Sequence, residues 1–199
     1  MSCIKFNTII STNDYLKSYA KFHHLENFFC IRADEQTKGK GQRSNIWKSE
    51  CCKNILVSFF VRYQIPVAKQ FLLNQIVSIA VVEFLEKFNI KGLQIKYPND
   101  ILSGRKKISG ILIENIIFKD KIKQSIIGIG LNVNQTDFDN LIFAVSMKNL
   151  TNQDYNLDVL TNELKEILKK MFEKDEKYIT KQYEKYLFKP KASTLKKME

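Results

Sequence analysis

The stretch from Lys96 to Asn115 reads KYPNDILSGRKKISGILIEN and decides how the middle of the chain folds. Two apolar runs, Ile101–Leu102 and Ile108–Ile117, flank the turn-forming pair Ser103–Gly104. Apolar runs joined by a short glycine-containing turn are typical of a β-hairpin. The sequence therefore predicts a pair of antiparallel strands near the centre of the chain.

Polar residues in the same stretch indicate a ligand-binding site. Asn99 and Asp100 offer oxygens of the kind that a magnesium–nucleotide complex prefers. Lys107 lies just before Gly110, where the lack of a side chain lets a ligand approach the backbone. Pro-Asn-Asp is also a common turn, so a purely structural role stays open for these three residues.

Other strands are predicted where β-branched and aromatic residues cluster. These segments are Lys5–Ile10, Asn27–Arg32, Asn54–Arg62, Leu93–Lys96 and Ile122–Val133. Gly128 and Gly130 lie inside the last segment, and glycines inside a strand indicate close approach of a ligand or another backbone.

Apolar residues at helical spacing predict three main helices. The first begins at Ser11 or Thr12, either of which can cap it, and runs to about Phe22. The second runs from Pro66 to about Phe88, and the third spans Leu157–Tyr186. Strands and helices do not alternate strictly, so we expect an α+β fold with a mixed sheet rather than a doubly wound one.

The segment EQTKGKGQRSNIW, Glu35–Trp47, contains a predicted loop at Thr37–Ser44. Gly39 and Gly41 allow tight turns that bring backbone N–H groups close to an anion, and basic side chains add positive charge. Such a loop suits a carboxylate or a polyphosphate and can close over it. A solvated basic surface loop fits the same residues equally well. The segment is not a Walker A loop, because GxxxxGK[ST] does not occur in the chain.

The composition fits one domain that binds small anions. The chain has 199 residues and a net charge of +11, but only four of its 32 basic residues are Arg, which argues against a nucleic-acid partner. Its uninterrupted apolar runs are far shorter than the roughly 18 residues of a membrane helix. The first residues lack a signal-peptide pattern, so we expect no membrane contact and a cytoplasmic location.

Cysteine usage gives no metal site. Cys51 and Cys52 are adjacent, Cys3 and Cys30 have no CxxC partner, and the two histidines are neighbours. No zinc pattern can be built from these residues. All four cysteines are therefore expected to be reduced thiols.

Six short motifs occur in one order: STNDYL at 11–16, EQTKGKGQRSNIW at 35–47, NILVSF at 54–59, KYPND at 96–100, KKISGILIE at 106–114 and GIGLNVN at 128–134. In this order and spacing the chain resembles the biotin–protein ligase family over roughly residues 8–135 and more weakly beyond. The resemblance implies a fold like that of class II aminoacyl-tRNA synthetases, with a mixed, mainly antiparallel sheet flanked by helices.

The resemblance implies a two-step reaction. The biotin carboxylate attacks the α-phosphate of Mg²⁺–ATP, which gives biotinyl-5′-AMP and pyrophosphate. A lysine of a biotin carboxyl carrier protein then attacks the mixed anhydride, and an amide forms. Both reactants of the first step are anions, so positive charge placed between them must offset their repulsion. A homodimer is compatible with the family.

The resemblance also assigns site residues. Those expected at biotin are Ser11, Thr12, Asn13, Gln36, Lys40, Gly41, Gln42, Lys107 and Gly110. Those expected at ATP are Trp47, Lys96, Asn99, Asp100 and Asn132, with Mg²⁺ near Asn99 and Asp100. Lys107 and Lys40 are the expected catalytic residues. Trp47 suits a core position nearly as well, and Asn132 suits a hydrogen-bonded core amide.

The chain departs from the family pattern at several points. Lys40 stands where the family loop has arginine, Ser44 where it has glycine, and Cys51–Cys52 where Pro-Gly is usual. We expect a catalytic domain at 1–188 and a basic tail at 189–199. Neither the C-terminal β-barrel nor the N-terminal DNA-binding domain of some family members is expected.

Two alternatives remain open. A lipoate ligase or octanoyltransferase shares the implied fold, although the chain has no RR-x-x-GGG-like segment. A degenerate, non-catalytic binding module is the second. ATP–pyrophosphate exchange with biotin or lipoate separates the three possibilities.

Overall fold

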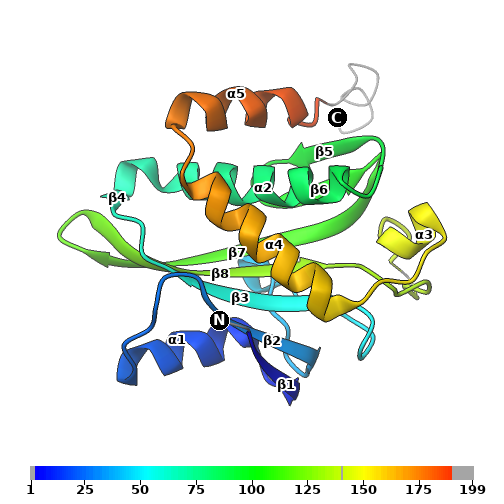
Figure 1. Ribbon diagram of the computed structural model, residues 1–199, viewed down its shortest axis with the longest axis horizontal. Coiled ribbons are helices and arrows are strands. Elements are labelled where there is room, and N and C mark those ends of the chain that lie inside the picture. The colour runs from blue at the N-terminus through cyan, green and yellow to red at the C-terminus, as the bar shows by residue number, and fades with distance from the viewer. Residues whose placement is uncertain (1–2, 140, 190–199) are drawn as a thin grey trace.

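A computed structural model of the protein describes residues 3–139 and 141–189, which form one mixed sheet with helices on both faces (Figure 1). The strand order is β1-β2-β3-β8-β7-β6-β5, and the short β4 pairs with β8. β1 runs parallel to β2, and the other paired strands are antiparallel. The predicted α+β class with a mixed, mainly antiparallel sheet is confirmed.

The strands are β1 (Ile4–Ile9), β2 (Phe29–Gln36), β3 (Ile55–Val61), β4 (Ile65–Pro66), β5 (Leu93–Lys96), β6 (Asp100–Ser103), β7 (Lys106–Phe118) and β8 (Lys121–Leu131). The helices are α1 (Thr12–Phe22), α2 (Gln70–Glu86), α3 (Met147–Thr151), α4 (Leu157–Phe172) and α5 (Glu176–Tyr186). Short 3-10 turns lie at Gln42–Ser44 and Val67–Lys69. The predicted central hairpin is confirmed as β6 and β7.

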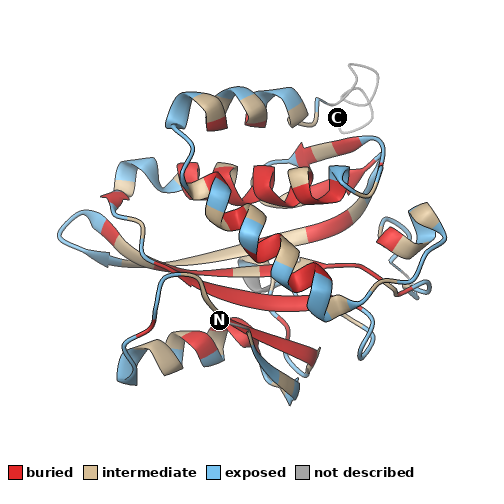
Figure 2. Cartoon of the chain, viewed as in Figure 1, coloured by how far each residue is buried: buried red, intermediate tan, exposed pale blue. Residues whose placement is uncertain are grey.

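The two faces of the sheet have different coverings. The main core, which includes Ile111, Ile127 and Ile129, lies on the face covered by α2, α4 and α5. Figure 2 shows buried stretches on α2 and α4 and on the strands beside them. On the opposite face α1 packs against a smaller cluster that includes Leu16 and Ile126. Because side chains alternate along a strand, the residues between those of the main core face the α1 side. That side carries the candidate site.

Helix α2 is the central helix of the main core. The segment Val67–Glu86 is long and apolar enough for a membrane span by length and composition, with a mean hydropathy of 1.3. Eleven residues of α2 are nevertheless buried, and the helix packs against α4, α5 and β7. No uninterrupted apolar run in the sequence is long enough for a membrane span. The segment Val67–Glu86 reaches that length only when its polar residues are included.

The boundaries of two predicted elements are wrong. The helix expected over Leu157–Tyr186 is two helices. α4 ends at Phe172, and α5 begins at Glu176. Asp175 caps α5 by accepting a hydrogen bond from Tyr178 N at 2.7 Å. Strand β2 continues to Gln36 instead of ending near Arg32, because it keeps its pairing with β1. The predicted tail at 189–199 lies outside the described residues except for its first residue.

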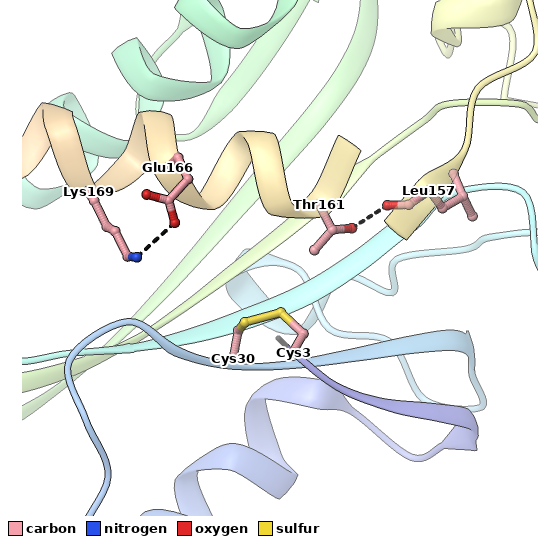
Figure 3. Close-up of a disulfide and its surroundings, with 6 residues drawn as sticks. All are labelled: Cys3, Cys30, Leu157, Thr161, Glu166 and Lys169. Atoms are coloured by element: carbon pink, nitrogen blue, oxygen red, sulfur yellow. Dashed lines mark hydrogen bonds and ion pairs between the residues drawn. A yellow bond between two sulfur atoms is a disulfide. The ribbon is translucent and has the colours of Figure 1, made fainter. Parts of the chain in front are cut away.

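Two cysteines are paired. Cys3 and Cys30 form a disulfide that joins the start of β1 to β2 beside α4 (Figure 3). The expectation of four reduced thiols is therefore wrong for this pair, and it holds for Cys51 and Cys52, which are free and exposed. The two paired cysteines come together because β1 and β2 are parallel neighbours, a contact that their spacing in the sequence does not reveal. The cytoplasmic prediction loses the support that unpaired thiols gave it.

Candidate functional site

A cavity of about 400 Å³ opens on the α1 side of the sheet. It is enclosed by the start of α1, the segment after β2, the β5–β6 turn, Gly110–Leu112 of β7 and Gly128–Gly130 near the end of β8. The predicted site residues that line it are Ser11, Thr12, Asn13, Gln36, Lys40, Gly41, Gln42, Trp47, Lys96, Asn99, Asp100, Lys107 and Gly110. The structure thus brings together residues from distant parts of the sequence.

The floor of the cavity has neighbouring glycines on β7 and β8. Gly110 is paired with Gly130, and Leu112 with Gly128. A Cβ added at Gly128 would lie 2.4 Å from Asn13 Oδ1, and one at Gly130 would lie 2.5 Å from Trp47 Cε2. The close approach expected at these strand glycines is therefore made by two side chains of the protein.

The end of the cavity beneath α1 is polar. Ser11 caps α1 and accepts a hydrogen bond from Asp14 N at 3.3 Å, so the first turn of the helix faces the cavity. Gln36 Oε1 accepts from Thr12 N at 2.7 Å, and Thr12 Oγ1 lies 3.0 Å from the same oxygen. This fixes the Gln36 carbonyl toward the helix and leaves its NH₂ group as the donor on the other side.

Lys107 is held in the middle of the cavity wall. Its Nζ lies 2.6 Å from Asp100 Oδ1 and 5.4 Å from the centre of the Trp47 ring. The Lys107 side chain is 36% exposed, so this cation remains accessible to an anion. Asp100, proposed from sequence for the nucleotide and its metal, is engaged by Lys107 in this structure.

Trp47 lies across the glycine floor. Its indole Nε1 is buried and has no hydrogen-bond partner among the described residues. The side chain covers Gly110 and Gly130 instead of joining the main core on the other face of the sheet. The core alternative for this tryptophan is therefore wrong.

The loop after β2 is folded. Gly41 N donates to Asn45 O at 2.7 Å, Trp47 N donates to Gly39 O at 3.0 Å, and Lys40 pairs with Ile46 as a short antiparallel bridge. The amide of Gly41, expected to face an anion, is thus used within the loop. The left-handed backbone position belongs to Arg43, with φ of 53°, and not to either glycine.

Lys40 connects this loop to α1. Its Nζ lies 2.7 Å from the Asp14 carboxylate. The hydrogen bond with Asp14 raises the pKa of Lys40 above its ordinary value, so the ammonium stays charged at neutral pH. Lys40 therefore brings a fixed positive charge to the rim of the cavity.

The turn between β5 and β6 is tied to β7. Asn99 Nδ2 donates to Ile111 O at 2.9 Å, and Ile111 N donates back to Asn99 O at 3.0 Å. Lys96 and Asp100 pair across this turn, and Asp100 contacts Lys107. Asn99 thus has a structural role, whatever else it contacts.

Asn132 is separate from the cavity lining. It follows β8, is 4% exposed, and donates through Nδ2 to Val145 O at 3.1 Å and to Lys107 O at 3.4 Å. The alternative of a hydrogen-bonded core amide describes this position. The predicted contact with a nucleotide does not fit it, although Asn132 supports the backbone of Lys107.

Several lining residues were missing from the sequence-based set. They are Arg43, Asn45, Ile46, Leu56, Val57, Tyr97, Pro98, Ile111, Leu112, Gly128, Ile129 and Gly130. The two strand glycines carried a signal, since they interrupt an apolar strand. The apolar members carry no such signal, because an apolar strand residue looks the same whether it faces a core or a cavity.

The geometry suits an elongated ligand with a polar head and an acidic tail. The head would meet Thr12 and Gln36, the apolar body would lie near Leu56 and Leu112, and the tail would approach the ammonium of Lys107. Charge-assisted hydrogen bonds from a lysine are among the stronger polar contacts in a protein.

Comparisons with known proteins agree with this geometry. The sequence profile of the Biotin/lipoate A/B protein ligase family matches residues 6–132. The bifunctional ligase/repressor BirA of Bacillus spizizenii is 41% identical over 109 residues, which are 55% of this chain and 34% of that protein. Human biotin–protein ligase is 31% identical over 114 residues, which are 54% of this chain and 15% of that protein. The chain thus matches about a third of the bacterial relative's length.

A solved structure extends the match beyond these segments. The biotin protein ligase of Aquifex aeolicus in complex with biotin and ATP superimposes with a TM-score of 0.78 and 25% identity. The match covers 94% of this chain and 78% of that one. Nearly the whole described fold therefore has a counterpart there.

Proposed function

The chain belongs to the biotin/lipoate A/B protein ligase family, and on this basis we propose that it is a biotin–protein ligase. It would activate biotin with ATP to biotinyl-5′-AMP and transfer the biotinyl group to a lysine of a biotin carboxyl carrier protein. The chain's similarity to biotin ligases, including one with biotin and ATP bound, favours this reaction over lipoate transfer.

One observation carries the proposal: a single cavity joins a polar end to an accessible lysine. Thr12 and Gln36 lie at the polar end, and Lys107 Nζ stands in the wall beyond the glycine floor. Biotin has a cyclic urea at one end and a carboxylate at the other, so its two polar groups match the two polar regions. We infer that its rings and chain lie along the floor between them.

Lys107 would act in the first step. The biotin carboxylate and the α-phosphate of ATP repel each other, and an ammonium between them stabilises the charge that develops as the new C–O–P link forms. Pyrophosphate leaves, and its charge must also be balanced. No covalent enzyme intermediate is required, so the protein contributes position and positive charge.

Mg²⁺ would arrive with ATP as part of the substrate. Mg²⁺ in nucleotide sites keeps several waters and takes one or two carboxylates together with phosphate oxygens. Among residues 3–139 and 141–189 no group of three or more His, Cys, Asp or Glu side chains could hold a metal ion. Asp100 is the carboxylate in the cavity, and it would have to leave Lys107 to meet the metal.

The second step needs a protein partner. We propose the carrier lysine as the acceptor: its neutral amine attacks the carbonyl carbon of the mixed anhydride, AMP leaves with the bridging oxygen, and the amine proton passes to solvent. No protein nucleophile is needed for this step. Lys40 at the cavity rim would hold the loop over the adenylate until the carrier arrives. A homodimer and a cytoplasmic location stay predictions.

ATP–pyrophosphate exchange tests the proposal. The purified chain should incorporate labelled pyrophosphate into ATP when biotin is present and not when biotin is omitted. Exchange with lipoate but not biotin would identify a lipoate ligase. Exchange with neither compound would indicate a protein that does not activate either acid, and both results would overturn the proposal.

A further inference from the structure

A carboxylate on strand β7 contacts the first turns of α1 from below. Glu114 Oε2 accepts a hydrogen bond from Asn13 Nδ2 at 3.0 Å, and Glu114 Oε1 lies 2.8 Å from Lys17 Nζ. The Glu114 side chain is 26% exposed, whereas Asn13 is 4% exposed. Glu114 does not line the cavity, yet its partner Asn13 does.

The side chain of Asn13 connects Glu114 to the polar end of the cavity. Its Oδ1 accepts a hydrogen bond from Ser58 Oγ at 2.6 Å, and its Nδ2 also lies 3.4 Å from Leu112 O. Ser58 is fully buried, and its Oγ lies 2.8 Å from Thr12 Oγ1. An unbroken chain of hydrogen bonds therefore runs from Glu114 to Thr12.

Glu114 determines which group donates and which accepts at each hydrogen bond from Asn13 to Thr12. A hydroxyl can either donate or accept, so Ser58 tolerates both orientations of the Asn13 amide. An ionised carboxylate only accepts, so Glu114 requires the Asn13 NH₂ group on its side and sends the carbonyl toward Ser58. The single Ser58 proton then goes to Asn13, so the Ser58 oxygen can accept the single Thr12 hydroxyl proton, and Gln36 Oε1 keeps the backbone N–H of Thr12 as its donor.

We propose that Glu114 is a positioning residue that sets the donor and acceptor directions at the polar end of the cavity. It acts through Asn13 and Ser58, and it fixes Thr12 as the group whose remaining lone pair faces a ligand N–H. The inference rests on the proposed function only in naming biotin as that ligand. A buried hydrogen-bond network holds its side chains rigidly when every polar group has a partner. It destabilises the fold when one buried group loses its partner.

Lys17 provides a matched control. It contacts the other oxygen of Glu114 and is 44% exposed, so the pair is a surface ion pair of small energy. Lys17→Ala removes that pair and leaves the Asn13–Glu114 hydrogen bond in place. Glu114→Gln removes the charge and keeps a carbonyl that can still accept from Asn13.

The test compares Glu114→Ala, Glu114→Gln and Lys17→Ala in the full chain. Biotin and ATP dissociation constants are measured separately from the fluorescence of Trp47, the only tryptophan. Glu114→Ala should weaken biotin about ten- to a hundredfold, as expected for losing a hydrogen bond to a charged group, and leave ATP unchanged. Glu114→Gln should lose only part of this affinity, because its amide can accept from Asn13 but can also donate to it, and Lys17→Ala should stay close to wild type. Equal losses for biotin and ATP, or no recovery with Glu114→Gln, would overturn the proposal.

A second readout does not depend on biotin. In ¹⁵N spectra the side-chain NH₂ of Asn13 should be protected from solvent exchange in wild type and Glu114→Gln, and lose protection in Glu114→Ala. If wild type fails to bind biotin, the proposed function fails, and this signal alone decides the role of Glu114. If Glu114→Ala does not fold, Glu114→Met replaces it, because it keeps the length of the side chain but has no acceptor oxygen.

Discussion

Gly130→Ala should displace Trp47 from the floor of the cavity. The new Cβ would lie 2.5 Å from Trp47 Cε2, whereas ordinary contacts begin at 3.4 Å, so the indole must move by about 1 Å. Overpacking of this size costs about 1–3 kcal/mol of stability. The change should also shift the Lys107 ammonium, which lies 5.4 Å from the centre of the same ring.

Urea unfolding and intrinsic fluorescence measure this effect together. We expect a lower urea midpoint and a red-shifted emission, because the moved indole meets more water. Gly41→Ala is the control, since its Cβ makes only ordinary contacts at 3.4 Å with Asn45. In the double variant Trp47→Ala/Gly130→Ala, followed by circular dichroism, the two losses should not add. An unchanged midpoint and emission in Gly130→Ala would refute the placement of the indole on this glycine.

Three further changes have defined outcomes. Lys107→Ala should lower the rate of adenylate formation by at least about tenfold, as expected for losing one charge-assisted contact, with an unchanged circular dichroism spectrum; full activity would mean that the central charge is assigned wrongly. Lys40→Ala should release adenylate into solution faster in a filter assay, because the contact with Asp14 that holds the loop is lost; unchanged release would show that the loop closes without it. The hydrogen bond with Cys52 raises the pKa of Cys51 from 9.0 to about 11, so the thiolate forms only at high pH. Iodoacetamide labelling of Cys51 should therefore keep rising from pH 9 to pH 11, and Cys52→Ala should move that rise to lower pH.

The sheet was largely predictable because its strands are continuous apolar runs with turns between them. The β6–β7 hairpin follows directly from Ser103–Gly104 between two such runs. The break between α4 and α5 was not predicted, although the five charged residues Glu173–Lys177 interrupt the apolar spacing there and Asp175 among them caps α5. The Cys3–Cys30 disulfide was missed because it depends on the parallel pairing of β1 with β2.

The candidate site was predictable where it uses polar residues in turns, and less so where it uses strands. Thr12 and Lys107 stand out as polar residues beside glycines or helix starts, and both line the cavity. Asn132 also stands out, but its amide is used by backbone carbonyls. Glu114 and Ser58 look like ordinary strand residues, and only the register of β7 with β8 and β3 with β8 shows that they lie under α1.

The most direct test of the central claim is to identify the product of the first step. The purified chain is incubated with Mg²⁺–ATP and an equimolar mixture of biotin and lipoate, then denatured, and the released small molecules are analysed by mass spectrometry. We expect biotinyl-5′-AMP, with loss of the signal in Lys107→Ala. Lipoyl-AMP as the sole adenylate, or no adenylate from a folded protein, would contradict it.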